Sequence, residues 1–305
     1  MTASLDGRVA LVTGAGRGIG RAIAEDLAQA GASVVIADNG TSIRGDGADP
    51  KIAREAADAI GGAAFDTSVA SPDAASAAVA LAVERFGGLD IVVNNAAILR
   101  DAFVFKMTAA DWEAMIRTNL SAAAYMIAAA TPVLRDQAKA GRGDGRWGRI
   151  INIVSTAGCY GNYGQAAYAS AKAGLLGLTR VTALDMARSQ VTCNAIAPFA
   201  ATRVTESIKP ANDEQAQYKD RAMAVPAEPV ARLSTMLAGS EGQAISGQLF
   251  GVRGREVFLF SQPRPVERFV ADAEIDLAAQ VNQTFRDSYT TLTTDLEAFA
   301  GEPVL

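Results

Sequence analysis

The stretch RVALVTGAGRGIG, residues 8–20, joins a short apolar segment to a run of glycines. Residues 8–13 are rich in Val and Leu, which favours a buried strand, and residues 13–20 (TGAGRGIG) lead directly into a helical pattern. Glycines at such a turn let the backbone approach a pyrophosphate, which the free N–H groups and the dipole of the following helix stabilise. A plain tight turn is the alternative interpretation.

The same signature of a short apolar run recurs along the chain, at residues 33–38, 63–66, 90–94, 149–155 and 191–197. Helical patterns alternate with these runs, at residues 20–30, 50–60, 72–86, 111–139 and 165–189. Residues 248–252 or 256–260 supply the last strand. Alternation of this kind builds right-handed βαβ units. We therefore predict an α/β fold of Rossmann type, with a doubly wound, mostly parallel sheet that has helices on both faces.

Asp38 closes the second predicted strand about twenty residues after the glycines, and this spacing strengthens the pyrophosphate interpretation. A carboxylate there accepts hydrogen bonds from both hydroxyls of an adenosine ribose and repels a 2′-phosphate. Arg17, within the glycine turn, favours NADP instead, because a cation there can bind the 2′-phosphate. Asp38 occupies the ribose position itself, so the predicted cofactor is NAD rather than NADP.

The chain of 305 residues suffices for one large domain with an appendage. We expect a dinucleotide-binding catalytic domain over residues 1–262 and a helical C-terminal extension over 263–305, which covers apolar surface of its own subunit or a neighbour. Residues 199–229 form a long connection of the kind that often becomes a lid. Residues 39–49 (NGTSIRGDGAD) form a long, polar, Gly-rich loop after the second strand.

Composition excludes several classes of chemistry. The chain has no histidine, so it has no Ser-His-Asp or Cys-His machinery and no histidine-ligated metal, and Cys159 and Cys193 are too isolated for a metal cluster. A net charge of −5 argues against nucleic acid as a partner. The first residues lack the pattern of a signal peptide, and no apolar stretch is long enough for a bilayer. We expect a soluble cytoplasmic protein.

Residues 168–172 (YASAK) place a tyrosine and a lysine one helical turn apart on one face. A free phenol has a pKa near 10, and a neighbouring ammonium together with a positively charged oxidised nicotinamide favours the phenolate. Lowering the pKa to about 7 requires roughly 4 kcal/mol, and Tyr168 then serves as a general base in alcohol oxidation. An ordinary pair on a helix surface is the alternative.

Ser155 ends the predicted strand 149–155, at the edge where open parallel sheets bind their ligands. Its hydroxyl can orient a substrate oxygen beside the phenol of Tyr168. A helix cap or turn is the ordinary role of an isolated serine.

Five motifs, TGAGRGIG, NNAA (94–97), TNL (118–120), Ser155 and YASAK, occur in the order and spacing of the short-chain dehydrogenase/reductase family, which residues 5–260 resemble. The resemblance implies a catalytic tetrad of Asn119, Ser155, Tyr168 and Lys172, in which Asn119 shapes a helix and supports a water relay to Lys172. It implies cofactor contacts by Gly14, Arg17, Gly18, Ile19, Gly20, Asp38, Asp66, Val69, Asn95, Ala96, Tyr168, Lys172, Pro198 and Thr202. The chain departs from the family at Ala97 and Phe199, where glycine is common, and neither change removes a reacting group.

Three longer stretches, at residues 94–101, 160–178 and 193–210, resemble the (3R)-hydroxyacyl-CoA dehydrogenase unit of multifunctional enzymes of type 2 and its stand-alone bacterial relatives. That resemblance implies NAD-dependent oxidation of a 3-hydroxyacyl-CoA and a homodimer or homotetramer formed through helices 111–139 and 165–189. Oxidation of a sterol or terpenoid alcohol is the alternative. A catalytically silent nicotinamide-sensing regulator is a third hypothesis, which the Tyr–Lys pair disfavours.

The substrate cleft is expected to be apolar with a basic mouth. The apolar residues assigned to it are Ile98, Phe103, Phe105, Tyr160, Tyr163 and Phe199. The cations assigned to the mouth, where the phosphates of CoA need partners, are Arg100, Lys106, Arg203 and Lys209. Ordinary core packing and solvated surface charge are the alternatives.

Overall fold

The computed structural model describes residues 4–142, 148–201, 213–265 and 292–305, together with residues 206, 268, 278, 279 and 281. Eight strands form one sheet in the order β3-β2-β1-β4-β5-β6-β7-β8. The strands are β1 (Val9–Thr13), β2 (Ser33–Ala37), β3 (Ala63–Phe65), β4 (Ile91–Asn94), β5 (Gly148–Ile153), β6 (Val191–Phe199), β7 (Leu249–Arg253) and β8 (Glu256–Phe260). All neighbours pair in parallel except β7 and β8, which form an antiparallel hairpin. Both candidates for the last strand are therefore strands.

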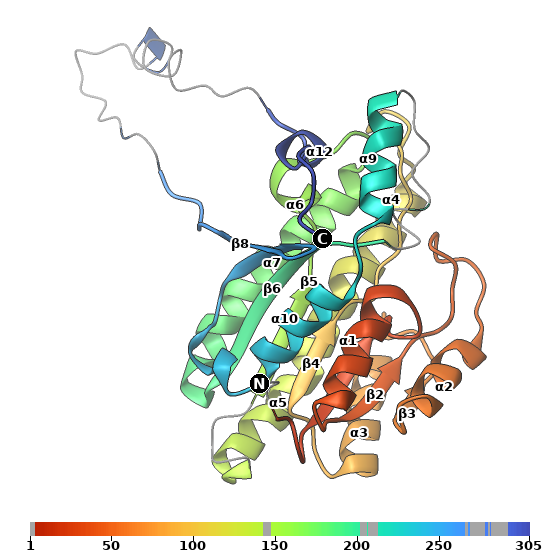
Figure 1. Ribbon diagram of the computed structural model, residues 1–305. Coiled ribbons are helices and arrows are strands. Elements are labelled where there is room, and N and C mark those ends of the chain that lie inside the picture. Colours follow the sequence, from red (N-terminus) through yellow and green to blue (C-terminus); the bar gives the residue numbers. More distant parts are fainter. Residues whose placement is uncertain are drawn as a thin grey trace.

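Helices cover both faces of the sheet (Figure 1). The helices are α1 (Gly18–Gln29), α2 (Pro50–Asp58), α3 (Pro72–Phe86), α4 (Ala109–Ile116), α5 (Ala122–Lys139), α6 (Ala157–Tyr160), α7 (Ala166–Met186), α9 (Asp213–Met223), α10 (Glu228–Ala238) and α12 (Asp295–Ala298). Buried residues of α1, α2 and α10 pack with one face of the strands, and those of α3, α5 and α7 pack with the other. This is the predicted doubly wound arrangement.

The register of the strands brings their carboxyl ends to one edge of the sheet. Thr13 at the end of β1 lies opposite Ala37 at the end of β2, and Asn94 at the end of β4 lies opposite Asn152 in β5. The buried amide Nδ2 of Asn94 donates to Oδ1 of Asn152 at 2.9 Å and so joins two central strands. Open parallel sheets bind ligands at this edge.

The predicted helix 111–139 is two helices. A π-helical turn over Arg117–Ser121 separates α4 from α5. The turn contains Asn119, whose buried side chain is bound to the backbone of Ile98. An extra residue in one turn of a helix is typical of functional sites, and a repeat of apolar residues along the sequence does not reveal it.

The structure describes only part of the predicted lid, residues 199–229, and only part of the C-terminal extension, residues 263–305. Within the predicted lid, residues 213–223 form α9, and α10 begins at Glu228. In the extension, residues 292–305 contain a single short helix, α12, between irregular segments. These residues therefore do not form the expected amphipathic helix, because the carbonyls of Phe299 and Gly301 accept from the side chain of Arg253 at the end of β7, and the carbonyl of Val304 accepts from the N–H of Arg255 in the turn before β8. In the described part of the chain no helix is long and apolar enough to cross a bilayer.

Candidate active site

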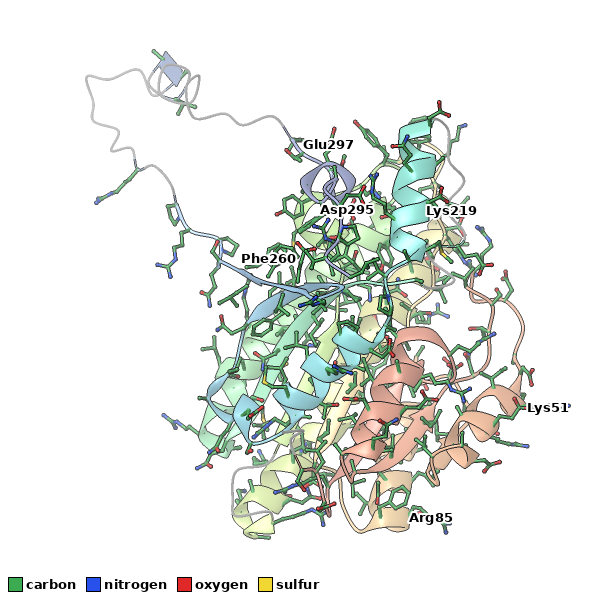
Figure 2. The ribbon with its side chains drawn as sticks, in the orientation of Figure 1. Lys51, Arg85, Lys219, Phe260, Asp295 and Glu297 are labelled. Carbon is green, nitrogen blue, oxygen red and sulfur yellow. The ribbon has the colours of Figure 1, made fainter. Side chains whose placement is uncertain are left out.

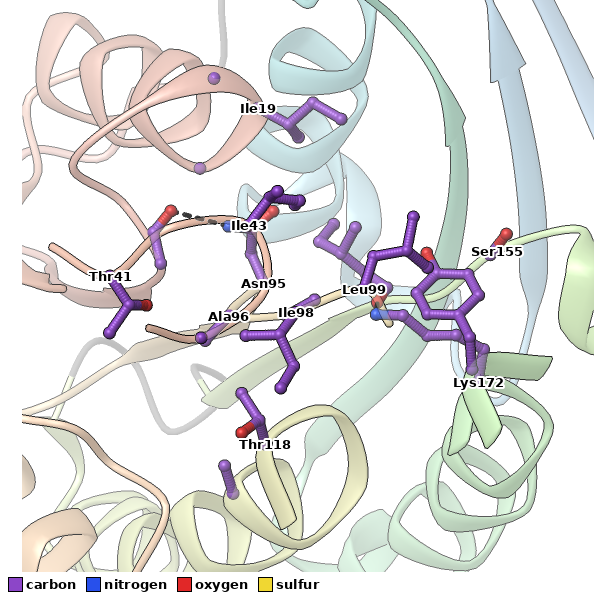
Figure 3. Close-up of a pocket in the computed structure, with 18 of the residues that line it drawn as sticks. Ile19, Thr41, Ile43, Asn95, Ala96, Ile98, Leu99, Thr118, Ser155 and Lys172 are labelled. Atoms are coloured by element: carbon purple, nitrogen blue, oxygen red, sulfur yellow. Dashed lines mark hydrogen bonds between the residues drawn. The ribbon is translucent and has the colours of Figure 1, made fainter. Parts of the chain in front are cut away.

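A cavity of about 1050 Å³ lies along the carboxyl edge of the sheet. Its walls come from the glycine turn before α1, the loop after β2, the segments after β4, β5 and β6, and helix α7. In Figure 3, Ser155 and Lys172 lie on one side of this pocket and Thr41 lies on the other, with Asn95 and Ile98 between them. One cavity therefore joins the predicted cofactor residues to the predicted catalytic residues.

The glycines of this turn leave backbone atoms exposed in space that Cβ atoms would otherwise occupy. Gly14 has a φ of 62°, and a Cβ there would lie 2.7 Å from the Cα of Ala96. A Cβ on Gly20 would collide with the carbonyl oxygen of Gly14 and with the amide of Asn95. That amide donates to the carbonyls of Thr13 and Gly14, at 3.0 and 2.9 Å, and fixes the turn against β4. The turn fits the close approach of a pyrophosphate at the start of a helix.

The carboxylate of Asp38 is held at the far end of the cavity. Its Oδ2 accepts from the N–H of Gly16 at 2.9 Å, and its Oδ1 accepts from the N–H of Gly40 at 2.7 Å. A carboxylate oxygen can accept a second hydrogen bond, so Asp38 is pre-oriented for ribose hydroxyls. The guanidinium of Arg17 donates to the carbonyl of Thr41 at 2.8 Å and thereby binds the loop 39–49.

The loop 39–49 also contacts the segment after β4. The carbonyl of Ile43 accepts from the N–H of Leu99 at 2.8 Å, and the carbonyl of Arg44 accepts from Nε of Arg100 at 2.7 Å. The guanidinium of Arg100 also pairs with Asp111 at 3.3 Å. The loop that follows the ribose carboxylate is thus a shared wall of both halves of the cavity.

The other predicted cofactor contacts divide into three groups. Those that line the cavity are Gly14, Arg17, Gly18, Ile19, Gly20, Asp38, Val69, Asn95, Ala96, Tyr168, Lys172 and Pro198. Asp66 does not line it, because its carboxylate accepts from Nε of Arg54 on α2 at 2.9 Å, and Thr67 and Ser68 take its place at the wall. Thr202 lies outside the described residues.

Ser155, Tyr168 and Lys172 meet on one wall. Ser155 lies two residues beyond β5, and its hydroxyl is hydrogen-bonded to the phenol of Tyr168 on α7. Lys172 is one turn further along α7, with Nζ 5.7 Å from the centroid of the Tyr168 ring. Its buried ammonium donates to the carbonyl of Ile153 at 2.8 Å. The helical spacing read from the sequence therefore produces the expected cluster.

In the protein by itself, the pKa of Tyr168 lies above the ordinary value of a phenol. Burial raises it to about 12, the hydrogen bond of Ser155 acts against the rise, and the carboxylates of Asp295 and Asp101 add to it. Burial also lowers the pKa of Lys172 to about 8. Desolvation disfavours the charged form of both groups, so Lys172 by itself does not lower the pKa of the phenol, and the predicted lowering depends on Lys172 acting together with an oxidised nicotinamide.

Asn119 lies behind this wall rather than in it. Its side chain is 1 % exposed, and its amide is paired on both sides with Ile98, accepting from the N–H at 2.8 Å and donating to the carbonyl at 2.9 Å. Ile98 itself lines the cavity. The side chain of Asn119 therefore positions the wall next to the cofactor residues.

The expected cleft residues are only partly brought together. Ile98, Tyr163 and Phe199 line the cavity, whereas Phe103 and Phe105 stack on each other in an exposed segment, 5.7 Å between ring centroids. Of the expected mouth cations, Arg100 is held by Asp111 as described, Lys106 is exposed, and Arg203 and Lys209 lie outside the described residues. Arg44 and Arg117, both exposed, line the cavity although the sequence analysis did not select them.

Sequence reasoning also missed Asp295, which lines the cavity from the C-terminal tail. Its Oδ2 accepts from the hydroxyl of Thr156, next to Ser155, at 3.3 Å. Nothing in the order of the sequence brings residues 139 positions apart together. A capping pattern was the available signal: Thr294 and Glu297 form a capping box that starts α12.

Comparison with known proteins gives the family. Residues 8–216 match the family described as short chain dehydrogenase. The chain thus belongs to the short-chain dehydrogenase/reductase family of oxidoreductases, as the motifs and the doubly wound sheet predicted. A solved short chain dehydrogenase from Mycobacterium avium has 36% identical residues and a TM-score of 0.77, covering 93% of this chain and 94% of that one.

Three relatives illustrate the range of activities. The hydroxyacyl-CoA dehydrogenase ChsB1 of Mycobacterium tuberculosis is 37% identical over 94% of this chain and 90% of its own. The 3-oxoacyl-(acyl-carrier-protein) reductase FabG of Vibrio cholerae is 39% identical over 82% of this chain and 98% of its own. The peroxisomal multifunctional enzyme type 2 of Drosophila melanogaster is 42% identical over 67% of this chain, which spans a third of that longer protein.

Proposed function

We propose that the protein is an NAD-dependent dehydrogenase that oxidises a secondary alcohol to a ketone, and that the alcohol is a 3-hydroxyacyl-CoA. The observation that carries the reaction is the meeting of Ser155, Tyr168 and Lys172 on one wall of a cavity whose other end holds Asp38. The substrate is supported by the similarity to ChsB1, which extends over nearly the whole of both chains.

Each reacting group has a defined task. Tyr168 in its phenolate form takes the hydroxyl proton of the substrate and becomes the neutral phenol, and the hydroxyl of Ser155, which is hydrogen-bonded to Tyr168, orients the substrate oxygen. The glycine turn and Asp38 fit NAD, which accepts the hydride and whose positive nicotinamide favours the phenolate that the protein by itself disfavours. The ammonium of Lys172 donates a hydrogen bond to the carbonyl of Ile153 and so places a positive charge beside the ring of Tyr168.

Asp38 is the basis for proposing NAD over NADP. We expect the unmodified enzyme to prefer NAD clearly. Asp38→Ala should lower the ratio of kcat/KM with NAD to kcat/KM with NADP by roughly tenfold, because removal of one carboxylate repulsion of this kind is worth on the order of 1.4 kcal/mol. Asp46→Ala removes a carboxylate from the same loop, away from the ribose position, and should leave the ratio unchanged. Equal use of both cofactors by the unmodified enzyme would show that Arg17 outweighs Asp38.

The substrate proposal is tested by steady-state kinetics on matched compounds. A (3R)-hydroxyacyl-CoA should be oxidised with a kcat/KM at least roughly tenfold above that of the corresponding free alcohol or acid, since the exposed cations Lys106, Arg44 and Arg117 can meet its phosphates. Turnover is followed as nicotinamide absorbance. If sterol or terpenoid alcohols have a higher kcat/KM than every CoA thioester, the proposed thioester substrate is overturned and oxidation of such an alcohol is supported.

The similarity to FabG supports a second candidate, reduction of a 3-oxoacyl group on a carrier protein. The same site serves both directions, because Tyr168 returns the proton when the ketone is reduced. Reductive assays with a 3-oxoacyl-CoA and with a carrier-protein thioester, each with NADH and NADPH, separate the two candidates.

We also propose that the enzyme is a homodimer or homotetramer that assembles through α5 and α7. Val181 and Leu184 on α7 are exposed, 55 % and 76 %, and apolar side chains three residues apart on a helix form one face.

A further inference from the structure

The C-terminal tail, residues 292–305, returns to the catalytic edge of the sheet. Arg253, at the end of β7, donates to the carbonyls of Phe299 and Gly301, both at 2.9 Å, and the N–H of Arg255 donates to the carbonyl of Val304 at 2.6 Å. The N–H of Asp295 donates to the carbonyl of Gly161, next to α6, at 3.3 Å. These contacts fix the tail at both of its ends.

An aromatic contact holds α12 over the pocket. The ring of Phe299 lies 4.7 Å from that of Phe199, which lines the cavity, and 5.9 Å from that of Tyr160 on α6. The rings of Phe258 and Phe260 on β8 complete the cluster. In Figure 2, Asp295 lies on the side of α12 toward the body of the molecule and Glu297 on the side away from it.

Asp295 consequently brings a carboxylate to the reacting centre. It lines the same cavity as Ser155 and Tyr168 and accepts from the hydroxyl of Thr156. A second carboxylate, Asp101, lines that cavity too. The charged groups that face Tyr168 are Lys172 on its own helix, Asp101 from the segment after β4, and Asp295 from α12. Two acidic groups therefore face one ammonium around the position where the hydroxyl is oxidised.

We propose that Asp295 is a specificity-determining residue, whose carboxylate disfavours substrates with a negative charge beside the reacting carbon and so selects neutral thioesters over free 3-hydroxy acids. In a free acid the carboxylate is joined to the reacting carbon through one CH₂, so it lies within about 4 Å of the reacting hydroxyl. Like charges at such distances in a partly desolvated pocket repel strongly. The thioester is neutral there. This inference rests on the proposed dehydrogenase function and deepens it.

The experiment compares a methyl (3R)-3-hydroxyalkanoate with its free acid, two compounds that differ at one end by a charge. In the unmodified enzyme the ester should have the higher kcat/KM. Asp295→Asn should raise kcat/KM for the acid about tenfold and change that for the ester by less than about twofold. Glu302→Gln is the matched control: it removes the same charge from the same tail, at an exposed side chain that pairs with Arg221 at 3.5 Å, and should change neither value.

A second readout separates electrostatics from packing. The pKa at which kcat/KM for oxidation rises with pH, which is that of the Tyr168 phenol, should fall in Asp295→Asn, because a carboxylate that opposes ionisation of the phenol is gone. It should stay in place in Glu302→Gln. An unchanged ratio of ester to acid, or an equal loss on both compounds without a shift of the profile, would overturn the proposal. Should thioesters and esters not be oxidised at all, the proposed substrate fails, and the charge comparison is made on neutral and carboxylate-bearing forms of the alcohol that is oxidised.

Discussion

Tyr168→Phe is expected to lower kcat by roughly 10²–10⁴, the usual contribution of a general acid–base group, while the proposed cofactor, NAD, binds almost as before. The substitution removes one hydroxyl, which is bonded to Ser155, and leaves the ring that stands beside Lys172. Single-turnover rates and a fluorescence titration with NADH measure the two effects separately.

Tyr163→Phe is the control for this change. Tyr163 lines the same cavity but is 78 % exposed, so loss of its hydroxyl should leave turnover close to that of the unmodified enzyme. A Tyr168→Phe enzyme with more than half of the original turnover would show that another group moves the proton.

Lys172→Met should make the protein more stable while it abolishes most of the activity. Burial lowers the pKa of Lys172 from 10.5 to about 8, so the fold carries a cost for holding the ammonium of about 3 kcal/mol, at 1.36 kcal/mol for each pKa unit. The hydrogen bond to Ile153 offsets part of that cost. Methionine fills a similar volume without the charge, and the free energy of unfolding should rise by about 1–3 kcal/mol.

The pH dependence of this gain identifies its cause. Below pH 8 the lysine is charged in both the folded and the unfolded chain, so the full cost is present; between pH 8 and 10.5 the folded form loses its proton first and the cost disappears. The raised pKa of Tyr168 acts only above pH 10 and therefore does not affect the comparison between pH 7 and pH 10. Urea unfolding at several pH values measures the difference, with exposed Lys106→Met as the control. A gain that does not change from pH 7 to 10 would show that packing, not charge, is responsible.

The fold could be predicted because its signals are local. Each buried strand is a short apolar run, and the glycine turn at 13–20 fixes the first strand–turn–helix unit. The π-turn at Arg117–Ser121 was missed because its cause, the pairing of Asn119 with the backbone of Ile98, is a tertiary contact. The helix α9 was missed because prolines near it indicate a loop.

The residues of the candidate site likewise divide into those that local sequence signals predict and those that depend on tertiary contacts. Tyr168 and Lys172 are one turn apart on one helix, so their spacing alone places them together, and Asp38 follows from its position at the end of a strand. The sequence does not show that Arg54 binds the carboxylate of Asp66, a residue that does not line the cavity. Asp295 reaches the pocket through a return of the chain that ends in side-chain and backbone contacts with Arg253, and no local pattern encodes such a path.

The loop 39–49 limits how the enzyme can be redesigned. Its carbonyls at Ile43 and Arg44 accept hydrogen bonds from Leu99 and Arg100, whereas its neighbour Asp38 faces the ribose position. Side chains of the loop can be exchanged without loss of these acceptors, but a shortened loop grafted to change cofactor preference would remove them. Engineering of the cofactor end and of the substrate end of the cavity is therefore coupled through the length of one loop rather than through its composition.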